Sequence, residues 1–454
     1  MSSISRGGPT LPGGFIWGAA TSSYQIEGAV TEEGRGESIW DRFSHTPGKT
    51  KNGETGDVAI DHYHLWKSDI DLMAELGLNA YRFSVAWPRI LPSGRGQVNS
   101  KGLDFYDRLV DGLLERGIDP WLTLYHWDLP QVLEDVGGWR NRATVDAFAE
   151  YTDVVTRRLG DRVKHWITIN EPWVASFLGH MLGILAPGIQ DLKATLASAH
   201  LLLLAHGRAV DIVRDNVKDA KVGITLNLAP VYPDSDSAAD EQAAHSMDGQ
   251  LNRWFLDPVY RGRYPEDLVR TLDESMPEIE AEDFSIISRP TDFLGINYYS
   301  PFYIAHDASS PMAMRMTDRE GEHTSVGWLV RPESLEELLV RVHDDYSPAA
   351  IYITENGAAF DDEPPVEGRV RDPRRTAYLH DHILAGLKSI DEDVPLKGYF
   401  VWSLFDNYEW SEGYSKRFGI TYVDYSTMER TLKDSARWYS EVTRSNSILP
   451  TGDD

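Results

Sequence analysis

The sequence of 454 residues contains no cysteine. A chain without thiols can form no disulfide, thiolate metal site or cysteine nucleophile, so its core alone must stabilise the fold. Residues 1–14 lack the apolar segment of a signal peptide, and the longest apolar run, residues 201–204, is far shorter than a membrane span. We therefore expect an unexported, cytoplasmic protein.

Basic residues are scarce, since 44 Lys and Arg stand against 71 Asp and Glu, for a formal net charge of −27. Such a charge repels nucleic acid and anionic lipid, so neither is expected as a partner. It does not disfavour a neutral ligand. The 14 Trp residues are a more specific indication of a sugar ligand than the net charge, because indole rings offer flat apolar faces to sugars as well as filling cores.

Motifs for metals and nucleotides are also missing. There is no HExxH sequence and no glycine-rich phosphate loop between a strand and a helix. His62 and His64 are two residues apart, a spacing that points them to different sides of a helix. We expect no metal and no cofactor.

Strand-like and helix-like stretches alternate along the chain. Eight runs rich in β-branched and aromatic residues are predicted as strands: 15–20, 80–84, 121–125, 163–171, 222–227, 293–297, 351–355 and 397–402. Apolar residues at helical spacing predict helices between them: 61–76, 102–116, 145–159, 192–213, 237–255, 335–345 and 374–390. Alternation of this kind predicts a parallel sheet with right-handed crossovers, and eight units suggest a closed barrel.

The predicted fold class is therefore α/β, a single (β/α)8 TIM barrel with elaborated loops at its C-terminal face. The predicted organisation is a flexible N-terminal segment (1–14), the barrel (15–446) and a C-terminal tail (447–454). Residues 307–327 and 361–371 follow strand ends and look like inserted loops.

Two of the predicted strands end on a carboxylate. Residues 351–357 read Ile-Tyr-Ile-Thr-Glu-Asn-Gly, with Glu355 at the strand end and Gly357 free to adopt a positive φ as the chain turns. Residues 163–172 end on Asn170-Glu171-Pro172. Two carboxylates at the same barrel face can serve as nucleophile and acid/base, although a single strand-end Glu is more often merely solvated.

Other polar and aromatic residues also follow strand ends, where barrel active sites are assembled. Each has an ordinary structural alternative: His126 could be a satisfied core histidine, Arg82 a buried ion pair, Asn297 a turn cap and Trp402 barrel packing. The full set is Gln25, Arg82, His126, Trp127, Asn170, Glu171, Asn297, Tyr299, Glu355, Trp402, Glu409 and Trp410.

The two carboxylate motifs, together with residues 15–28 and 402–410, resemble the family 1 glycoside hydrolases, the β-glucosidase family. The resemblance runs from about residue 11 to 439, and one departure is Ile169, where the family usually has Phe. It implies that Glu171 is the acid/base and Glu355 the nucleophile of a retaining enzyme, with carboxyl groups about 5–5.5 Å apart.

The resemblance also implies the remaining roles. Arg82 and Tyr299 match groups that keep the nucleophile ionised, with Asn297 in support. Trp328 matches the aromatic wall of the aglycone side. The positions that match sugar-binding groups are Gln25, His126, Trp127, Asn170, Trp402, Glu409 and Trp410.

The function expected from these residues is hydrolysis of terminal non-reducing β-D-glucosyl residues from a β-glucoside or a short cello-oligosaccharide. Transglycosylation uses the same residues, so the sequence leaves it open. A non-catalytic sugar-binding barrel would be expected to lack one of the two glutamates, and both are present. Because Glu409 would repel a 6-phosphate, unphosphorylated sugars are the expected substrates.

Overall fold

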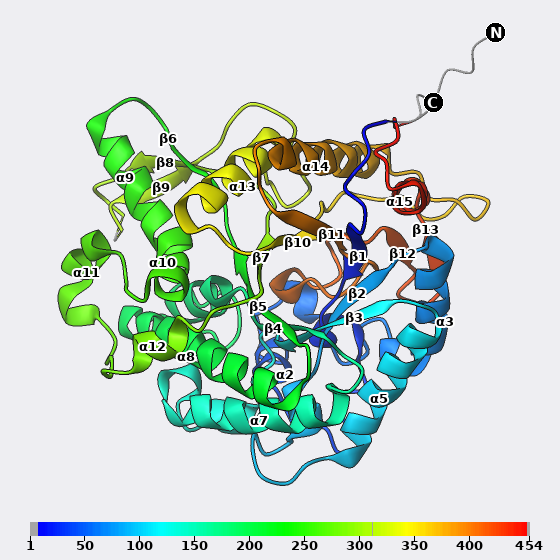
Figure 1. The fold of residues 1–454 in the computed structure, drawn as a ribbon, viewed down its shortest axis with the longest axis horizontal. Coiled ribbons are helices and arrows are strands. Elements are labelled where there is room, and N and C mark those ends of the chain that lie inside the picture. The colour runs from blue at the N-terminus through cyan, green and yellow to red at the C-terminus, as the bar shows by residue number, and fades with distance from the viewer. Residues whose placement is uncertain (1–7, 311, 452–454) are drawn as a thin grey trace.

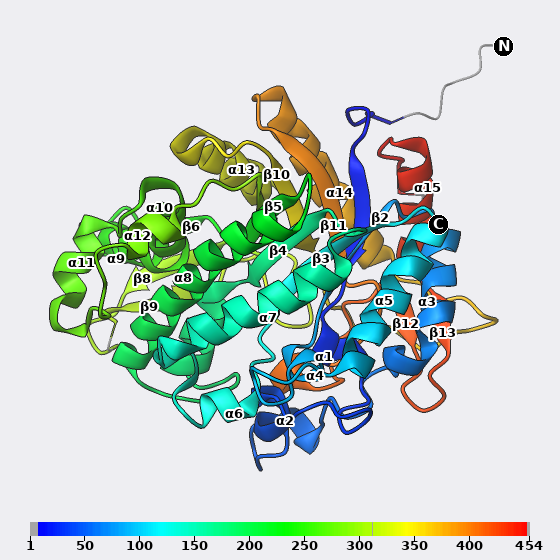
Figure 2. The ribbon, with the colours of Figure 1, turned by 60° about the horizontal axis from the view of Figure 1, so that its bottom comes forward.

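The computed structural model of the protein describes residues 8–310 and 312–451. Eight parallel strands close into a barrel in the order β1, β2, β3, β4, β5, β7, β10 and β11, and β11 pairs again with β1 (Figures 1 and 2). Their bounds are β1 Ile16–Ala20, β2 Ala80–Ser84, β3 Asp119–Tyr125, β4 His165–Asn170, β5 Lys221–Asn227, β7 Phe293–Asn297, β10 Ile351–Asn356 and β11 Leu396–Trp402. The predicted (β/α)8 barrel is confirmed, and each predicted run contributes one of its strands.

Helices surround the barrel (Figure 1). The longer ones are α3 His62–Leu76, α5 Ser100–Glu115, α7 Ala143–Leu159, α8 Leu192–Asn216, α9 Ala238–Asp248, α10 Trp254–Arg261, α13 Glu333–Tyr346, α14 Pro373–Asp391 and α15 Asp434–Ser445. The shorter ones are α1 Ser23–Ile26, α2 Ile39–Ser44, α4 Trp87–Ile90, α6 Gln131–Glu134, α11 Glu266–Leu272 and α12 Asp283–Ile287. The predicted helix 237–255 is α9 and the start of α10, joined by a π-helical segment, Gly249–Arg253.

Local sequence sets several helix ends. Gly77 follows α3 in the left-handed conformation (φ 74°), which glycine adopts without a Cβ clash. Asp191 caps α8, its carboxylate accepting a hydrogen bond from the backbone N–H of Ala194 (2.7 Å). Gly77 thus marks the end of α3 and Asp191 the start of α8, and both lie at helix boundaries that the sequence predicts.

Helix α8 is long and apolar enough to cross a membrane by length and composition alone, and it is the one such helix in the described part of the chain. The most apolar 18-residue stretch of this helix is 78% buried inside the protein. The helix packs against α7, β4 and β5, which accounts for its apolar composition.

The barrel interior is filled rather than hollow. The ring of Trp121 lies 5.4 Å from that of Phe293 and 5.1 Å from that of Phe400, centroid to centroid. Such packing stabilises the closed sheet by removing large aromatic surfaces from water. It leaves the carboxyl ends of the strands for polar groups.

One stretch predicted as an inserted loop contains regular structure. Within residues 307–327, strand β9 (Met314–Thr317) pairs with β8 (Phe302–His306), which also pairs with β6 (Val231–Pro233). This small sheet lies beside α9 (Figure 1), and Met314 packs against an apolar cluster that includes Ile304 and Met247. The loop prediction is wrong there because β9 becomes a strand by pairing with residues far away in the sequence, which the local sequence does not reveal.

Two further short strands, β12 (Thr421–Val423) and β13 (Arg430–Leu432), form a hairpin.

The prediction of a positive φ at Gly357 is also wrong, since this glycine is absent from the described positions with positive φ. Glycine is needed there for a different reason. A Cβ at Gly357 would lie 1.7 Å from the backbone oxygen of Trp402. The close approach of two strand ends, rather than a turn, excludes a side chain.

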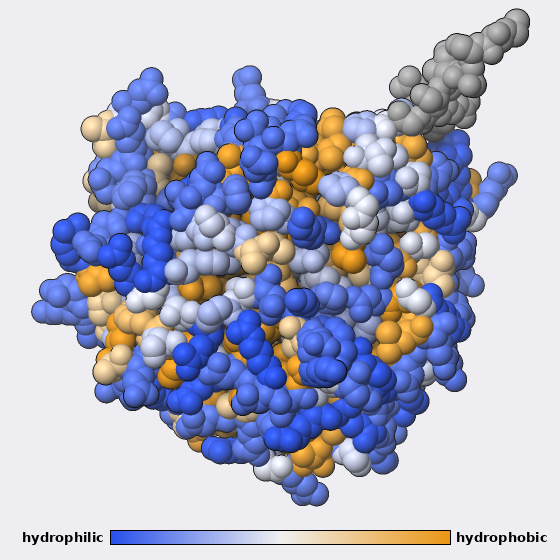
Figure 3. Space-filling model, in the orientation of Figure 1, coloured by the Kyte–Doolittle hydropathy of each residue, from blue (hydrophilic) through white to orange (hydrophobic). Residues whose placement is uncertain are grey.

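The two ends of the described chain meet. The N–H of Leu11 donates to the carbonyl of Asn446 (3.0 Å), and the N–H of Ile448 donates to that of Pro9 (2.9 Å). Residues 1–7 and 452–454 lie outside the described residues, so their part of the predicted terminal segments stays a prediction. The surface face in Figure 3 is mainly hydrophilic, with scattered hydrophobic residues.

Candidate active site

Glu355 lies at the end of β10 and is 3% exposed. Its Oε1 accepts a hydrogen bond from Nη1 of Arg82 (2.5 Å), and its Oε2 accepts one from the hydroxyl of Tyr299 (2.7 Å). Burial raises the pKa of Glu355, and the Arg82 charge together with the Tyr299 hydrogen bond opposes that rise. Both oxygens therefore have partners that favour the ionised form.

Glu171 directly follows β4, with φ of 45°, and is 5% exposed. Its Oε1 accepts a hydrogen bond from Nδ2 of Asn297 (2.7 Å), and no cation contacts it among the described residues. Burial raises the pKa of Glu171 to about 8, and the Glu355 carboxylate adds to the rise. The two carboxyl groups thus have different environments, one paired with a cation and the other with an amide.

Arg82, fully buried in β2, connects both glutamate motifs. Besides Glu355 its Nη1 donates to the carbonyl of Thr354 (3.0 Å), and its Nη2 donates to Oδ1 of Asn170 (2.5 Å). Asn170 must then point its Nδ2 at Nε2 of His126 (3.1 Å). Burial lowers the pKa of His126 well below its ordinary value and Arg82 lowers it further, so the ring is neutral. Because Nε2 then accepts from the Asn170 amide, the ring proton is on Nδ1.

A third carboxyl group, Glu409, lies near Glu355 and contacts Gln25. Nε2 of Gln25 donates to the carbonyl of Tyr408 (2.8 Å), to Oδ1 of Asn407 (3.1 Å) and to Oε2 of Glu409 (3.4 Å). Glu409 is partly exposed, yet the surrounding burial raises its pKa to about 8, and Glu355 adds to the rise. At neutral pH this carboxyl group can both donate and accept hydrogen bonds.

Aromatic rings line this region. The ring of His126 is nearly parallel to those of Trp402 (5.9 Å, 17°) and Trp410 (6.1 Å, 19°). Trp127 packs on Trp410 at 4.6 Å, and its Nε1 donates to the carbonyl of Asn170 (2.9 Å). Flat apolar faces next to polar groups suit one face of a sugar ring.

Trp328 is 37% exposed and lies at the outer side of the site. Its ring is 5.1 Å from that of Tyr299 and 6.0 Å from that of Phe418. The structure thus places the predicted aglycone wall beside the tyrosine that contacts Glu355. All thirteen predicted residues belong to one connected set of contacts at the carboxyl ends of the strands.

Several residues of this region escaped the sequence reasoning. Thr354 donates its hydroxyl to Oδ1 of Asn297 (2.8 Å) and so orients the amide that contacts Glu171. Asn227 ends β5 opposite Asn297, and its buried Oδ1 has no partner among the described residues. Because Asn227 is the last residue of a predicted strand, the search for polar residues at strand ends could have identified it. No sequence signal marks Thr354 or Phe418.

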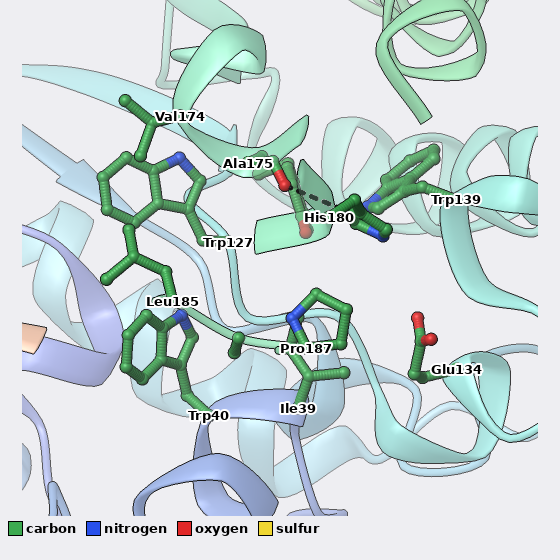
Figure 4. A pocket seen from close by; sticks show the side chains of 12 residues that line it. Ile39, Trp40, Trp127, Glu134, Trp139, Val174, Ala175, His180, Leu185 and Pro187 are labelled. Atoms are coloured by element: carbon green, nitrogen blue, oxygen red, sulfur yellow. Dashed lines mark hydrogen bonds between the residues drawn. The ribbon is translucent and has the colours of Figure 1, made fainter. Parts of the chain in front are cut away.

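A small cavity adjoins the site behind Trp127 (Figure 4). It lies between the segment after β3 and the π-helical segment Val174–Met181 that follows Glu171. Nε2 of His180 and Nε1 of Trp139 line it and have no hydrogen-bond partner among the described residues. The wall behind Trp127 is therefore partly polar.

Buried ion pairs anchor the loop that carries Glu409. Within this loop, Asp406 accepts from Nζ of Lys433 (2.7 Å) and from Nη1 of Arg417 (2.6 Å). Lys433 also pairs with Asp362 (2.6 Å), which belongs to the predicted inserted loop 361–371. Arg417 is therefore engaged in holding the loop.

No group of three or more His, Cys, Asp or Glu side chains suited to a metal occurs among the described residues. The two closely spaced histidines have separate partners. His62 pairs with Asp69 (2.7 Å) in the interior, and His64 pairs with Asp61 (2.5 Å) at the surface.

The sequence model of Glycosyl hydrolase family 1 matches residues 8–448, nearly the whole chain. The chain belongs to this family. As a family 1 member it is a glycoside hydrolase, which confirms the enzyme class and the family predicted from the motifs. The connected set of carboxyl, amide and aromatic side chains is thus the candidate active site of a family 1 glycosidase.

Named relatives extend the match. The protein is similar to Beta-glucosidase A of Thermotoga maritima, at 52% identity over 96% of this chain and 98% of the relative. Beta-glucosidase A of Acetivibrio thermocellus is 50% identical over 97% of this chain and 99% of the relative. A solved structure of the Thermotoga maritima β-glucosidase in complex with deoxynojirimycin superposes with a TM-score of 0.95 at 51% identity, covering 97% and 100% of the two chains.

Proposed function

We propose that this family 1 enzyme is a retaining β-glucosidase that removes terminal non-reducing β-D-glucosyl residues from β-glucosides or short cello-oligosaccharides. The observation that carries the proposal is the contrast between two buried carboxyl groups. Glu355 contacts Arg82 and Tyr299, whereas Glu171 accepts a hydrogen bond from the amide of Asn297, contacts no cation among the described residues and has a pKa of about 8. Different environments give the two groups different protonation states.

In the first step, the Glu355 carboxylate attacks the anomeric carbon while protonated Glu171 gives its proton to the leaving oxygen. A covalent glycosyl-enzyme forms and the aglycone leaves as an alcohol. Arg82 favours the anionic nucleophile, and the Asn297 amide orients the acid. Retaining enzymes hold the two carboxyl groups about 5–5.5 Å apart, which is the spacing we expect here.

In the second step, Glu171, now a carboxylate, takes a proton from water as the water oxygen attacks the anomeric carbon. The bond to Glu355 breaks, and glucose leaves with its original β configuration. An acceptor alcohol in place of water gives transglycosylation through the same residues. The ratio of these two outcomes depends on which acceptor occupies the site.

The glycone preference follows from Gln25 and Glu409, whose polar atoms suit neutral hydroxyl groups. The nearby cations that could compensate a phosphate are engaged elsewhere, since Lys416 donates to the carbonyl of Ser325 (2.5 Å) and Arg417 pairs with Asp406. We expect β-glucosides to be substrates, followed by β-galactosides or β-fucosides, and 6-phospho-β-glucosides to be poor ones.

The ratio of kcat/KM for p-nitrophenyl β-glucoside to that for its 6-phosphate tests this preference. The ratio should exceed one and should increase between pH 6 and pH 9, because Glu409 gains its charge through a pKa of about 8. Ionisation of Glu171 affects both substrates equally and cancels in the ratio. A ratio favouring the phosphorylated sugar would refute the preference.

Release of p-nitrophenol from the aryl β-glucoside, with NMR of the first-formed sugar anomer, tests the function as a whole. The expected result is turnover with β-glucose as the initial product. Initial α-glucose would refute retention, and binding without turnover would favour a non-catalytic sugar-binding barrel.

A further inference from the structure

Asn356 follows Glu355, ends β10 and has no exposed surface. Its side chain makes three hydrogen bonds. Nδ2 donates to the carbonyl of Tyr298 (2.7 Å) and to the hydroxyl of Tyr378 (3.1 Å), while Oδ1 accepts from the hydroxyl of Tyr399 (2.6 Å). This side chain does not face the sugar-binding groups described above.

The direction of each bond is fixed by chemistry. The carbonyl of Tyr298 can only accept, so the Asn356 atom facing it must be the amide nitrogen. The hydroxyl of Tyr378 donates to the carbonyl of Tyr299 (3.2 Å), which leaves it free to accept from Asn356. The chain of donors therefore has one consistent arrangement.

These bonds hold the backbone on both sides of Tyr299. The Tyr298 carbonyl belongs to the peptide group before Tyr299, and the Tyr299 carbonyl to the one after it. The side chain between them points its hydroxyl at Oε2 of Glu355 (2.7 Å). A second tie runs along the backbone, where the N–H of Tyr298 donates to the carbonyl of Glu355 (3.0 Å).

We propose that Asn356 and Tyr378 are positioning residues for the nucleophile: they fix both peptide groups flanking Tyr299 and so keep its hydroxyl on the Glu355 carboxylate. The inference rests on the proposed function, in which Glu355 is the nucleophile. Neither residue belongs to the sugar-binding groups described above. Both act through Tyr299.

The two tyrosines that hydrogen-bond to Asn356, Tyr378 and Tyr399, are themselves packed against neighbouring rings. The ring of Tyr378, on α14, stacks on His382 at 3.8 Å, and Nδ1 of His382 contacts the carbonyl of Tyr378 (2.7 Å). Tyr399, in the middle of β11, packs on Tyr439. The Asn356 side chain donates two hydrogen bonds, to α14 and to the segment after β7, and accepts one from β11. An amide can make this combination of bonds, whereas a carboxylate cannot donate.

The consequence is a change in the ionisation of Glu355. Its carboxylate is stabilised by hydrogen bonding to Tyr299, whose own pKa burial raises well above the ordinary value, so that the phenol stays protonated. If the Tyr299 backbone loosens, this bond weakens and the nucleophile needs a higher pH to ionise. The charged or titratable groups that face Glu355 are Arg82, Glu171, Tyr299 and Glu409.

The test uses Tyr378→Phe, which removes the hydroxyl between Asn356 and Tyr299 and keeps the ring stacked on His382. We expect about tenfold lower kcat/KM for p-nitrophenyl β-glucoside, the effect of weakening one hydrogen bond to a charged group. The acidic limb of the kcat/KM profile should move to higher pH. Inhibition by free glucose should be unchanged, because the sugar-binding groups are untouched.

The matched control is Tyr151→Phe. Tyr151 is equally buried and its hydroxyl also contacts backbone carbonyls, those of Val85 and Leu124 (3.0 Å each), which lie at the ends of β2 and β3 and not in the segment after β7 that carries Tyr299. Both variants should lower the melting temperature, whereas only Tyr378→Phe should move the acidic limb. An unmoved acidic limb in Tyr378→Phe would overturn the proposal and leave the network a purely structural one.

Asn356→Asp provides a second measurement. It places a carboxylate oxygen against the Tyr298 carbonyl, so kcat/KM should fall further than in Tyr378→Phe and the acidic limb should again move to higher pH. An unshifted limb in this variant would also count against the proposal. All comparisons are made relative to the unaltered enzyme, so inactivity of that enzyme on β-glucosides would refute the proposed function instead.

Discussion

Replacing Glu171 by Ala should separate the two chemical steps. Burial and the neighbouring Glu355 raise the pKa of the wild-type carboxyl group to about 8, so at pH 6 most of the enzyme carries the proton that the leaving group needs. The substitution removes that proton and leaves the Asn297 amide without its acceptor. Glu355 and its contacts with Arg82 and Tyr299 remain in place.

The magnitude depends on the leaving group. General acid catalysis contributes about 10²- to 10⁴-fold, so kcat/KM for cellobiose or methyl β-glucoside should fall by that factor. For 2,4-dinitrophenyl β-glucoside, whose leaving group needs no proton, the first step should change by less than about tenfold. The alkaline limb of the kcat/KM profile, which follows loss of the Glu171 proton through pH 8, should disappear.

The assay is stopped-flow and steady-state kinetics with this substrate pair, with Glu171→Gln as the control of the same shape. A burst of dinitrophenol followed by slow turnover is expected, because the second step lacks its base. Added azide should accelerate turnover and give the β-glucosyl azide, since it enters on the face that Glu171 occupied. Equal loss for good and poor leaving groups would refute the acid/base assignment.

Two further outcomes follow from the same structure. Glu355→Gly should reduce kcat by roughly 10⁴-fold or more, and it should also lower the melting temperature, because the buried Arg82 cation loses its carboxylate partner. Azide should then give the α-glucosyl azide; retained activity would end the nucleophile assignment. Lys433→Met should destabilise the protein by about 3–5 kcal/mol in urea unfolding at pH 7, because Asp362 and Asp406 lose their buried cation; a change below about 1 kcal/mol would show that the two carboxylates are satisfied without it.

Much of the fold could be predicted because its signal is local. Each barrel strand is a short β-branched run, and the helix periodicity and end residues such as Gly77 act within one or two turns. The positions of Glu171 and Glu355 at strand ends were readable in the same way. The parallel barrel then requires strand ends to share one face, which is why dispersed motifs predicted a single site.

Features that depend on residues far away in the sequence could not be predicted from the local sequence. Strand β9 forms because it pairs with β8, which in turn pairs with β6. The polar stretch with three Met residues gives no indication of either partner strand. Gly357 was correctly singled out for the wrong reason, since the backbone of Trp402 excludes its Cβ.

The sequence by itself determined the order of the elements, the set of chemical groups and their assignment to one end of the barrel. Only the tertiary structure decided how those groups are paired. Arg82 contacts Glu355 and not Glu171, and Asn297 contacts Glu171, across more than a hundred residues of chain. Protonation follows from such pairing and from burial, which are properties of three-dimensional neighbours, so the different roles proposed for two otherwise identical glutamates depend on the fold.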